Sequence, residues 1–477
     1  RDVLRFVTIE EGPLSRTLVA HPDADRVILT GGWETAQLFR SWRPDLPLLA
    51  ETSGKNAIVV TPSADIDLAV ADLVKSAFGH AGQKCSAASL AILVGSVADS
   101  DRFRRQLVDA VSSLKIGYPD DPAVAMGPVI EPPRGKLADG LTTLGEGESW
   151  LLPPRQLGAD ERLWSPGIRA GVLPGSRFHT TEYFGPVLGI MHAQDLDEAI
   201  TWQNATDYGL TAGIHSLDAD EVTTWIDRVE AGNLYVNRGI TGAVVRRQPF
   251  GGWKRSSVGT TGKAGGPNYL AHLGTWRSRP LRSSTAASPL APAVEALLAT
   301  AAAHLDAVER DELRAAAQSD HVAWTREYGV AKDVTHLGVE RNVFRYVPVP
   351  VTIRFDGRLP DLVRVLLTAA RTGSTVTVSS GSSLPPGLVP GVTVETHAQW
   401  LAHAAATRPS RVRLIGTGPV ELAAAVEGDP DVAIHSGAVT LSGRVEALPF
   451  LQEQSISITN HRFGNPDPQL EHVLPRH

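Results

Sequence analysis

The sequence contains a single cysteine, Cys85, among 477 residues, and only 2 methionines. One cysteine excludes an internal disulfide and any zinc or iron–sulfur centre that needs several thiolates, so we expect no metal site. No run of apolar residues approaches the roughly 18–20 needed to cross a bilayer. These absences predict a cytoplasmic protein without a membrane span.

The chain also has no excess of positive charge. Its 45 Lys and Arg stand against 52 Asp and Glu, for a formal charge of −7, and no long basic run is present. Binding to nucleic acid or to an anionic membrane surface is therefore not expected. The length predicts two to four domains at roughly 100–200 residues each. With 42% apolar residues, 44 Gly and 33 Pro, the composition is that of a loop-rich globular protein.

Strand and helix patterns alternate along the first half of the chain, which predicts an α/β sheet. The first strand is followed at once by Gly31 and Gly32. This glycine pair either only forms a turn or also contacts a phosphate group of a ligand. We expect residues 1–11 to be part of a strand and its exit loop, continuing an upstream segment. The expected strands lie at 26–30, 57–60, 91–94 and 232–237, and the expected helices at 34–40, 65–78, 101–114 and 196–203.

A second α/β unit is expected after residue 292. Residues 277–292 are typical of a linker, 293–317 of an alanine-rich helix, and the strands 375–379 and 411–415 each precede a glycine. The Gly-Thr-Gly at 416–418 has no third glycine at the offset that a dinucleotide fingerprint requires, and we interpret it as a turn. The alternating tail at 454–463 predicts a half-buried strand that must pair with another.

Three short motifs carry reactive side chains. Cys85 lies on a glycine-entered turn between a helix and a strand, beside Lys84, a cation that could favour the thiolate. The alternative is a buried, inert cysteine. Glu51 enters a turn directly before a strand, and Glu182 precedes a Tyr-Phe-Gly-Pro turn. Either glutamate could be a solvated surface residue.

In this order and at these separations, the motifs resemble the aldehyde dehydrogenase superfamily from about residue 3 to residue 276. The resemblance implies that Cys85 is the nucleophile and Glu51 the general base. It also implies that Glu182 and Phe184 position the nicotinamide riboside of NAD, with Gly31 and Gly32 near the pyrophosphate. The family's oxyanion-binding Asn and ribose-binding Lys would lie upstream of residue 1, so NAD versus NADP preference stays open.

The glycine-rich segment 262–270 concentrates backbone N–H groups, as a carboxylate anchor requires, although it could be a plain flexible loop. Its sequence resembles the anchor loop of Δ1-pyrroline-5-carboxylate dehydrogenases, which oxidise L-glutamate γ-semialdehyde to L-glutamate. The resemblance implies a substrate site formed by Ser86, Phe250, Gly265 and Gly266. The alternatives are another semialdehyde dehydrogenase or a non-catalytic binding or assembly module.

The tail at 448–464 resembles the C-terminal part of bifunctional proline utilization A flavoenzymes. That resemblance implies an upstream proline dehydrogenase domain, with FAD only if that domain belongs to the same polypeptide, and a homo-oligomer. We expect an aldehyde dehydrogenase fold followed by a second aldehyde-dehydrogenase-like α/β domain. The expected divisions are 1–50 (cofactor domain, C-terminal part), 51–232 (catalytic), 233–276 (anchor loop and return segment), 277–292 (linker) and 293–477 (C-terminal domain with a terminal lid or assembly strand).

Overall fold

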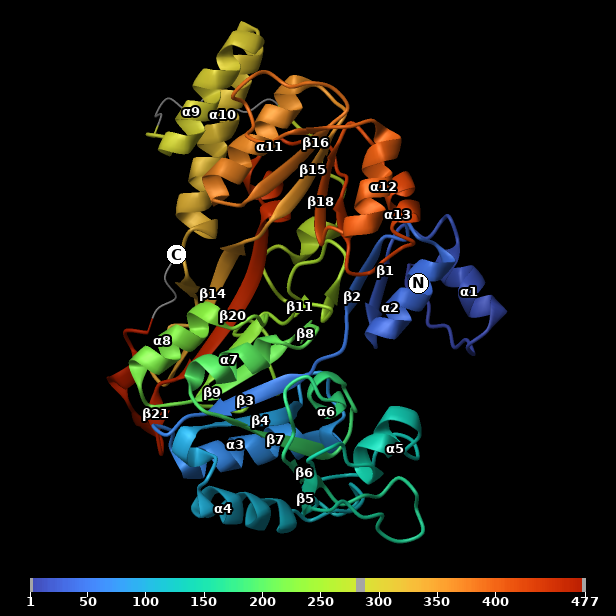
Figure 1. The fold of residues 1–477 in the computed structure, drawn as a ribbon, viewed down its shortest axis with the longest axis vertical. Helices are drawn as coiled ribbons and strands as arrows, with labels where there is room; N and C mark the ends of the chain where they lie inside the picture. Colours follow the sequence, from blue (N-terminus) through green and yellow to red (C-terminus); the bar gives the residue numbers. More distant parts are fainter. Residues whose placement is uncertain (1–2, 280–287, 474–477) are drawn as a thin grey trace.

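A ten-stranded mixed sheet dominates the computed structural model, which describes residues 3–279 and 288–473 (Figure 1). Its strands, in spatial order, are Lys332–Asp333 (β13), Glu340–Pro348 (β14), Leu451–Thr459 (β20), Asn233–Val236 (β10), Thr211–His215 (β9), Asn56–Val60 (β3), Ala88–Val94 (β4), Val187–Ala193 (β7), Gly167–Ala170 (β6) and Ser149–Leu152 (β5). The strands from β20 to β6 run parallel, whereas β13, β14 and β5 are antiparallel to their neighbours.

Both faces of the central strands are buried, because helices cover each side. Successive residues of β3 alternate between two apolar clusters, with Ala57 and Val59 in one and Ile58 and Val60 in the other. Such two-sided burial explains why these strands are continuous apolar runs. The covering helices are Ile66–Phe78 (α3) and Asp101–Ser112 (α4) on one face, and Leu196–Asn204 (α7) and Ala219–Arg228 (α8) on the other. The strands and helices predicted for this region are confirmed.

A small sheet beside the large one carries the first part of the chain. It consists of Val27–Thr30 (β1), Leu48–Glu51 (β2) and Ser257–Val258 (β12), with helices Pro13–Ala20 (α1) and Trp33–Trp42 (α2) alongside. The strand expected within 1–11 is wrong for residues 3–11, which form no strand and leave Phe6 94% exposed. Residues 3–11 pair with no strand of the described residues, and an isolated extended segment is not stable in water. Residues 1–2 lie outside the described residues.

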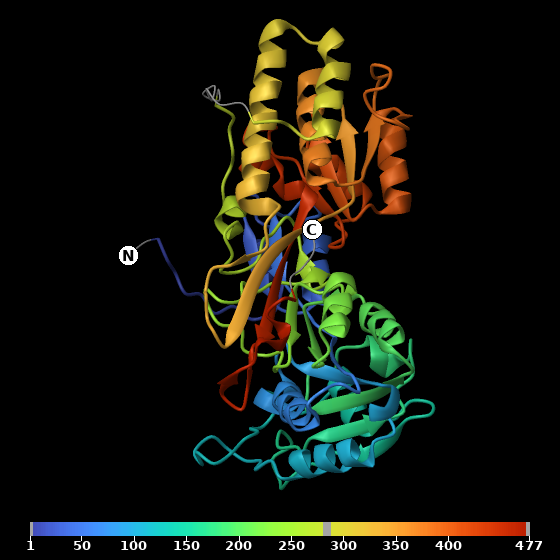
Figure 2. The same cartoon turned by 90° about the vertical axis from the view of Figure 1, so that its left-hand side faces the viewer.

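The second α/β unit is confirmed. Its five parallel strands are, in order, Thr393–Val394 (β17), Val376–Ser380 (β16), Val351–Phe355 (β15), Arg411–Ile415 (β18) and Ala433–His435 (β19). Relative to their sequence this is the 3-2-1-4-5 order of dinucleotide-binding sheets. Helices Pro292–Ala301 (α9), Ala307–Ala323 (α10) and Leu359–Thr372 (α11) pack on one face, and His397–Thr407 (α12) and Pro419–Ala425 (α13) on the other (Figure 2).

The single alanine-rich helix expected at 293–317 is wrong, because the structure has two helices, α9 and α10. Asp306 starts α10 by accepting from the amide of Glu309 at 2.8 Å, while the Glu309 carboxylate accepts from the amide of Asp306 at 3.1 Å. This reciprocal cap satisfies amides that a continuous helix would have paired internally. Of the expected linker, residues 280–287 lie outside the described residues.

The terminal strand β20 is an interior strand. It is parallel to β10 on one edge and antiparallel to β14 on the other, so both edges are hydrogen-bonded (Figure 2). The predicted pairing is confirmed, but the half-buried character is wrong, since residues 454–458 are buried on both faces. The second α/β unit and the large sheet are therefore joined through β14 and β20.

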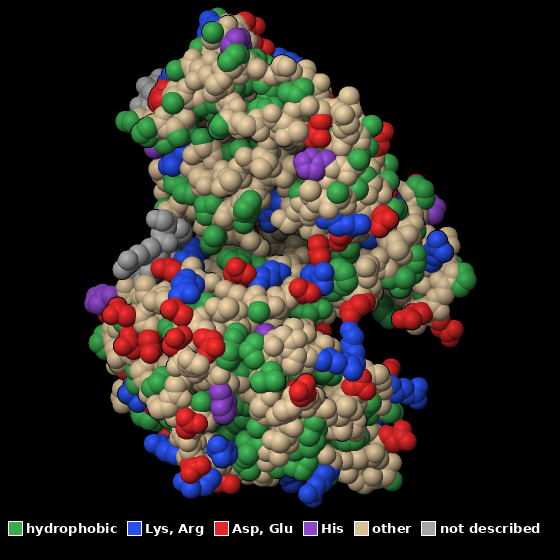
Figure 3. Space-filling model, viewed as in Figure 1, with side chains coloured by type: hydrophobic (Ala, Val, Ile, Leu, Met, Phe, Trp, Pro, Cys, Tyr) green, Lys and Arg blue, Asp and Glu red, His purple; other side chains and the backbone are tan. Residues whose placement is uncertain are grey.

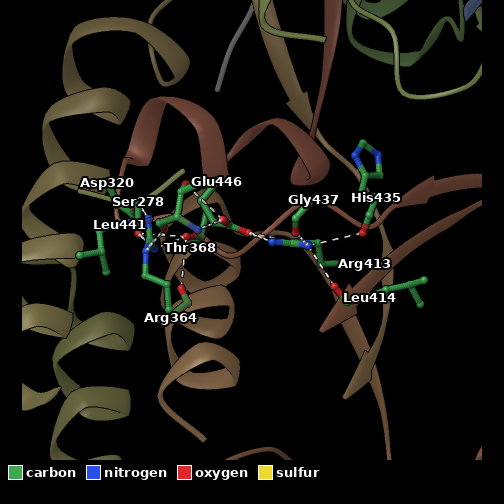
Figure 4. A network of polar contacts seen from close by, with 11 residues as sticks. Ser278, Asp320, Arg364, Thr368, Arg413, Leu414, His435, Gly437, Leu441 and Glu446 are labelled. Carbon is green, nitrogen blue, oxygen red and sulfur yellow. Dashed lines mark hydrogen bonds and ion pairs between the residues drawn. The ribbon is translucent and has the colours of Figure 1, made fainter. Parts of the chain in front are cut away.

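Two buried ion pairs cross-link the second unit (Figure 4). The Arg364 guanidinium on α11 meets the Asp320 carboxylate on α10 at 2.8 Å, and Arg413 on β18 meets Glu446 at 2.8 Å. Arg364 also donates to the carbonyl of Thr440, whose amide donates to Glu446, so the two pairs share one network. Buried charges persist only when paired in this way.

The remaining helices and strands are short. They are Gly135–Thr142 (α5), Arg177–Thr180 (α6), Gly443–Glu446 (α14), Tyr208–Gly209 (β8), Trp253–Lys254 (β11), His461–Arg462 (β21) and Asn465–Pro466 (β22). Among the helices of the described residues, none combines the length and apolar character needed to cross a membrane.

Candidate active site

Cys85 lies on the turn that leads from the short 3-10 segment Gly79–Gly82 into β4. Gly82 has φ +67°, and a Cβ there would lie 2.2 Å from the carbonyl oxygen of Gly185. Only glycine permits this approach. The carbonyl of Cys85 accepts a 2.8 Å hydrogen bond from the side-chain amide of Asn56, so the turn is held from two sides.

The segment between β2 and β3 brings the other motifs to this turn. The amide of Gly54 donates to the Glu182 carboxylate at 3.0 Å. A Cβ on Gly54 would lie 2.3 Å from the carbonyl oxygen of Cys85, so the same residue also packs against the cysteine turn. The structure thus assembles Glu51, Cys85 and Glu182 from three separate elements around one glycine.

Glu51 is the last residue of β2, and its carboxylate is buried. Neither oxygen makes a hydrogen bond of ordinary geometry within the described residues. Burial raises the pKa of Glu51 to about 7, although the Lys263 cation and the Gly252 amide oppose the shift and Glu453 adds to it. A carboxyl group that titrates near neutrality can take and return a proton under physiological conditions.

The pKa of the Cys85 thiol is raised by burial and by the charges of Glu182 and Glu51. Burial is the largest cause of the shift and Lys84 does not offset it, so the expectation that Lys84 favours the thiolate is wrong for this structure. A raised pKa disfavours the thiolate, and forming it requires a base to remove the thiol proton. Glu51 is the adjacent group whose pKa suits that task.

Glu182 and Phe184 lie beside the cysteine turn, on the segment that leads into β7. Burial raises the pKa of Glu182, while the Gly54 amide, Ser53 and Lys55 favour its charged form. Phe184 is 39% exposed and has φ +52°, a strained conformation for an aromatic residue. The side chain of Gln83 donates to the carbonyl of Phe184 at 3.2 Å and helps to hold it there.

Gly31 and Gly32 form the turn between β1 and the N-terminus of α2. The amide of Gly31 donates to the carbonyl of Glu51 at 3.2 Å, which ties this turn to the end of β2. Gly32 is the N-cap residue of α2, and a Cβ there would lie 3.2 Å from a carboxylate oxygen of Glu34. The turn is consequently adjacent to Glu51 and leaves little room for a larger side chain.

The glycine-rich loop is only partly open. Phe250 and Ala264 form a two-way backbone bridge, with N–O distances of 3.0 and 2.7 Å. The amide of Gly266 already donates to the carbonyl of Lys263 at 2.8 Å, whereas Gly265 has φ +72° and open space where a Cβ would lie. Of the two glycines, Gly265 is the one whose surroundings leave room for a ligand.

Ser86 is buried, and its carbonyl accepts from the Thr211 hydroxyl at 3.3 Å. No hydrogen bond joins Ser86 to the segment 262–270 in the part of the chain that the structure describes. The expected substrate residues are thus divided between the cysteine turn and the glycine-rich loop.

Two charged residues near Glu51 were not predicted. Lys263 is buried and donates through Nζ to the side-chain oxygen of Asn233 at 2.9 Å and to the carbonyl of Gly251. Burial lowers the pKa of Lys263 to about 7, against the opposing charges of Glu453 and Glu51. Lys263 lies within the glycine-rich segment 262–270, where a single cation is a detectable signal, whereas nothing local in the sequence points to Glu453.

A cavity of about 670 Å³ opens beside these residues. It is lined by Glu51, Lys263 and Glu453, and from the second α/β unit by Arg411 and His435. Figure 3 shows the surface hollowed between the two halves of the molecule, with acidic and basic side chains along the hollow. Among the described residues, no group of His, Cys, Asp or Glu side chains is arranged to hold a metal ion.

These features define a thiol flanked by two carboxylates on an α/β scaffold, and residues 1–277 match the model of the aldehyde dehydrogenase family. The chain belongs to that family. A 1-pyrroline-5-carboxylate dehydrogenase of Geobacillus sp. strain WCH70 is 40% identical over 278 residues, covering 56% of this chain and 53% of the relative. The enzyme of the same name from Bacillus subtilis strain 168 is 36% identical, with the same coverage.

Similarity to solved structures extends beyond residue 277. The structure of proline utilization A from Corynebacterium freiburgense is 49% identical to this chain, with a TM-score of 0.83 over 96% of this chain and 44% of that one. Proline utilization A from Bdellovibrio bacteriovorus matches 54% of this chain and 27% of that one, with 34% identity and a TM-score of 0.50. The chain spans about half the length of the relatives that it matches, or less.

Proposed function

We propose that this chain is the dehydrogenase region of an enzyme that oxidises L-glutamate γ-semialdehyde to L-glutamate with NAD⁺. The observation that carries the proposal is Cys85 between Glu51 and Glu182, in a chain similar to enzymes named 1-pyrroline-5-carboxylate dehydrogenase. The similarity to proline utilization A over 96% of the chain supports an upstream proline dehydrogenase domain, with its FAD, on the same polypeptide. A cytoplasmic homo-oligomer is part of the same proposal.

The chemistry of the chain's own residues follows from their pKa values. Glu51 removes the proton of the Cys85 thiol, and the sulfur adds to the aldehyde carbon to form a thiohemiacetal. The backbone N–H of Cys85 is available to stabilise the oxyanion. Glu51 returns its proton to the thiohemiacetal oxygen, which loses it to solvent as hydride leaves the carbon. The regenerated Glu51 carboxylate then takes a proton from water, which attacks the thioester. The carboxylic acid product leaves, and Glu51 gives its proton to the departing sulfur to restore the Cys85 thiol.

The residues around Cys85 fit a nicotinamide cofactor. Glu182 offers a buried carboxylate to ribose hydroxyls, Phe184 presents an exposed ring beside it, and the Gly31–Gly32 turn stands at a helix N-terminus suited to phosphate. NAD⁺, when bound, accepts the hydride that leaves the thiohemiacetal carbon. Gly265, with Ser86 and Phe250, is proposed to contact the substrate carboxylate, while Gly266 shapes the loop.

The test uses the intact natural polypeptide and follows NADH formation. Cys85→Ala should abolish turnover, and Glu51→Gln should slow acylation as well as thioester hydrolysis, so that the NADH burst falls together with steady-state turnover. Glutamate semialdehyde should have a higher kcat/KM than succinic semialdehyde or propanal. Preference for succinic semialdehyde would favour another semialdehyde dehydrogenase, and full turnover by Cys85→Ala would refute the mechanism.

A further inference from the structure

One carboxylate from the C-terminal strand holds both ends of the glycine-rich loop. Glu453 on β20 accepts from the amide of Lys263 at 2.6 Å and from the side-chain amide of Asn268 at 2.7 Å. Between those two donors lie only residues 264–267, which include Gly265. The loop is therefore closed by a residue that lies 190 positions after Lys263 and 185 positions after Asn268 in the chain.

The clamp is itself fixed by neighbouring strands and helices. Asn268 also donates to the Tyr346 hydroxyl on β14 at 2.9 Å and accepts from Arg444 at 3.2 Å. The indole N–H of Trp253 donates to the carbonyl of Glu453 at 2.7 Å. Charge-assisted bonds to a carboxylate held in this way are stronger than bonds between neutral groups, so the loop is restrained more firmly than its glycines would suggest.

The clamp is connected through Lys263 to Glu51, the proposed base. The Lys263 side chain runs from the clamped end of the loop to Gly251 and Asn233. A Cβ on Gly251 would lie 3.2 Å from a Glu51 oxygen and 3.3 Å from Cγ of Lys263, so Gly251 is packed between them. A movement of the loop would therefore shift Lys263 and Gly251 and change the packing around the Glu51 carboxylate.

We propose that Glu453 is a positioning residue of the dehydrogenase site, which presets the 263–268 loop to receive the carboxylate of the substrate. The inference rests on the proposed function. Because an open glycine loop pays the entropy of ordering when a ligand binds, preordering it lowers the KM of a carboxylated aldehyde specifically. An aldehyde without a carboxylate does not use the loop and gains less.

Steady-state kinetics of the intact polypeptide give the first test. Glu453→Ala should reduce kcat/KM for glutamate semialdehyde, relative to that for propanal, at least tenfold and mainly through KM. Glu453→Gln, which keeps one acceptor, should recover part of the ratio. The matched control is Glu395→Gln, since Glu395 is also largely buried but its partners, Ser379 and His403, belong to the second α/β unit. An equal fall for both aldehydes, or an unchanged ratio, would overturn the proposal.

Hydrogen–deuterium exchange separates this inference from the proposed function, because it needs no substrate. In Glu453→Ala the amides of 262–270 should exchange at least tenfold faster than in the parent protein, and in Glu395→Gln they should not. Unchanged exchange in Glu453→Ala would refute the clamp even if the parent enzyme prefers glutamate semialdehyde. If the loop exchanges faster in Glu453→Ala but the parent enzyme does not prefer glutamate semialdehyde, the clamp is supported and the proposed substrate is refuted.

Discussion

Replacing Glu51 by Gln should stabilise the protein while it removes the base. The pKa of this carboxyl group is raised from 4.5 to about 7, chiefly by burial. The folded chain therefore binds a proton more tightly at this site than the unfolded chain does. Between those two pKa values stability falls as the pH rises, since folding then opposes ionisation. A neutral amide of the same shape has no such dependence.

The size of the effect follows from the shift. One pKa unit corresponds to about 1.36 kcal/mol. The advantage of Gln over Glu should thus be small near pH 4.5 and grow with pH to roughly 3 kcal/mol by pH 8. For domains of roughly 150–250 residues, each kcal/mol moves Tm by about 2–4 °C. The difference in Tm between variant and parent should accordingly grow by several degrees from pH 5.5 to pH 8.

The assay is thermal unfolding of the parent, Glu51→Gln and a control variant at pH values from 5.5 to 8. Glu312→Gln is the control, because Glu312 is exposed on α10 and should follow the parent at every pH. A difference between Glu51→Gln and the parent that does not change with pH would refute the reasoning. It would mean that Glu51 is not the buried, destabilising charge that its surroundings indicate.

Two further substitutions test the scaffold. Gly82→Ala should cost roughly 1–3 kcal/mol and most of the dehydrogenase activity, since its Cβ would meet the Gly185 carbonyl at 2.2 Å in a left-handed conformation. Gly79→Ala, in the same turn but with open space at Cβ, should retain activity, and equal loss in both would contradict the packing argument. Asp320→Asn should destabilise the second unit by about 3–5 kcal/mol, because it leaves the buried Arg364 guanidinium without its carboxylate. Asp311→Asn, exposed on the same helix, should leave Tm unchanged, and a Tm drop of the same size there would mean that burial is not the cause.

Local patterns predicted most of the regular structure. The strand at 57–60 and the helix that follows are specified by apolar spacing and by the Asp65 cap, which accepts from the amide of Leu68. The errors arose where pairing over long distances decides the outcome. Residues 3–11 have strand-like composition but no partner, and 454–458 alternate as if half exposed yet lie between two other strands.

The sequence motifs selected residues that the structure brings together, but their electrostatics could not be predicted. Glu51, Cys85 and Glu182 come from separate elements, and the segment that contains Gly54 joins them. Lys84 precedes Cys85 in the sequence, and the prediction assumed that its positive charge would also lie close enough to lower the pKa of the thiol. The pKa of Cys85 is instead set by burial and by two carboxylates from other elements, which sequence spacing does not reveal.

Strand β20 links the second α/β unit to the ten-stranded sheet. Its backbone satisfies one edge of β10, and its Glu453 side chain satisfies two donors of the glycine-rich loop. If β20 were withdrawn, β10 would present an unpaired edge, and Lys263 would lose one of the two carboxylates that offset its burial. Asn233 of β10 accepts from Lys263, and Lys263 is the cation that opposes the raised pKa of Glu51. A change in the second unit that displaced β20 would therefore also alter the surroundings of Glu51.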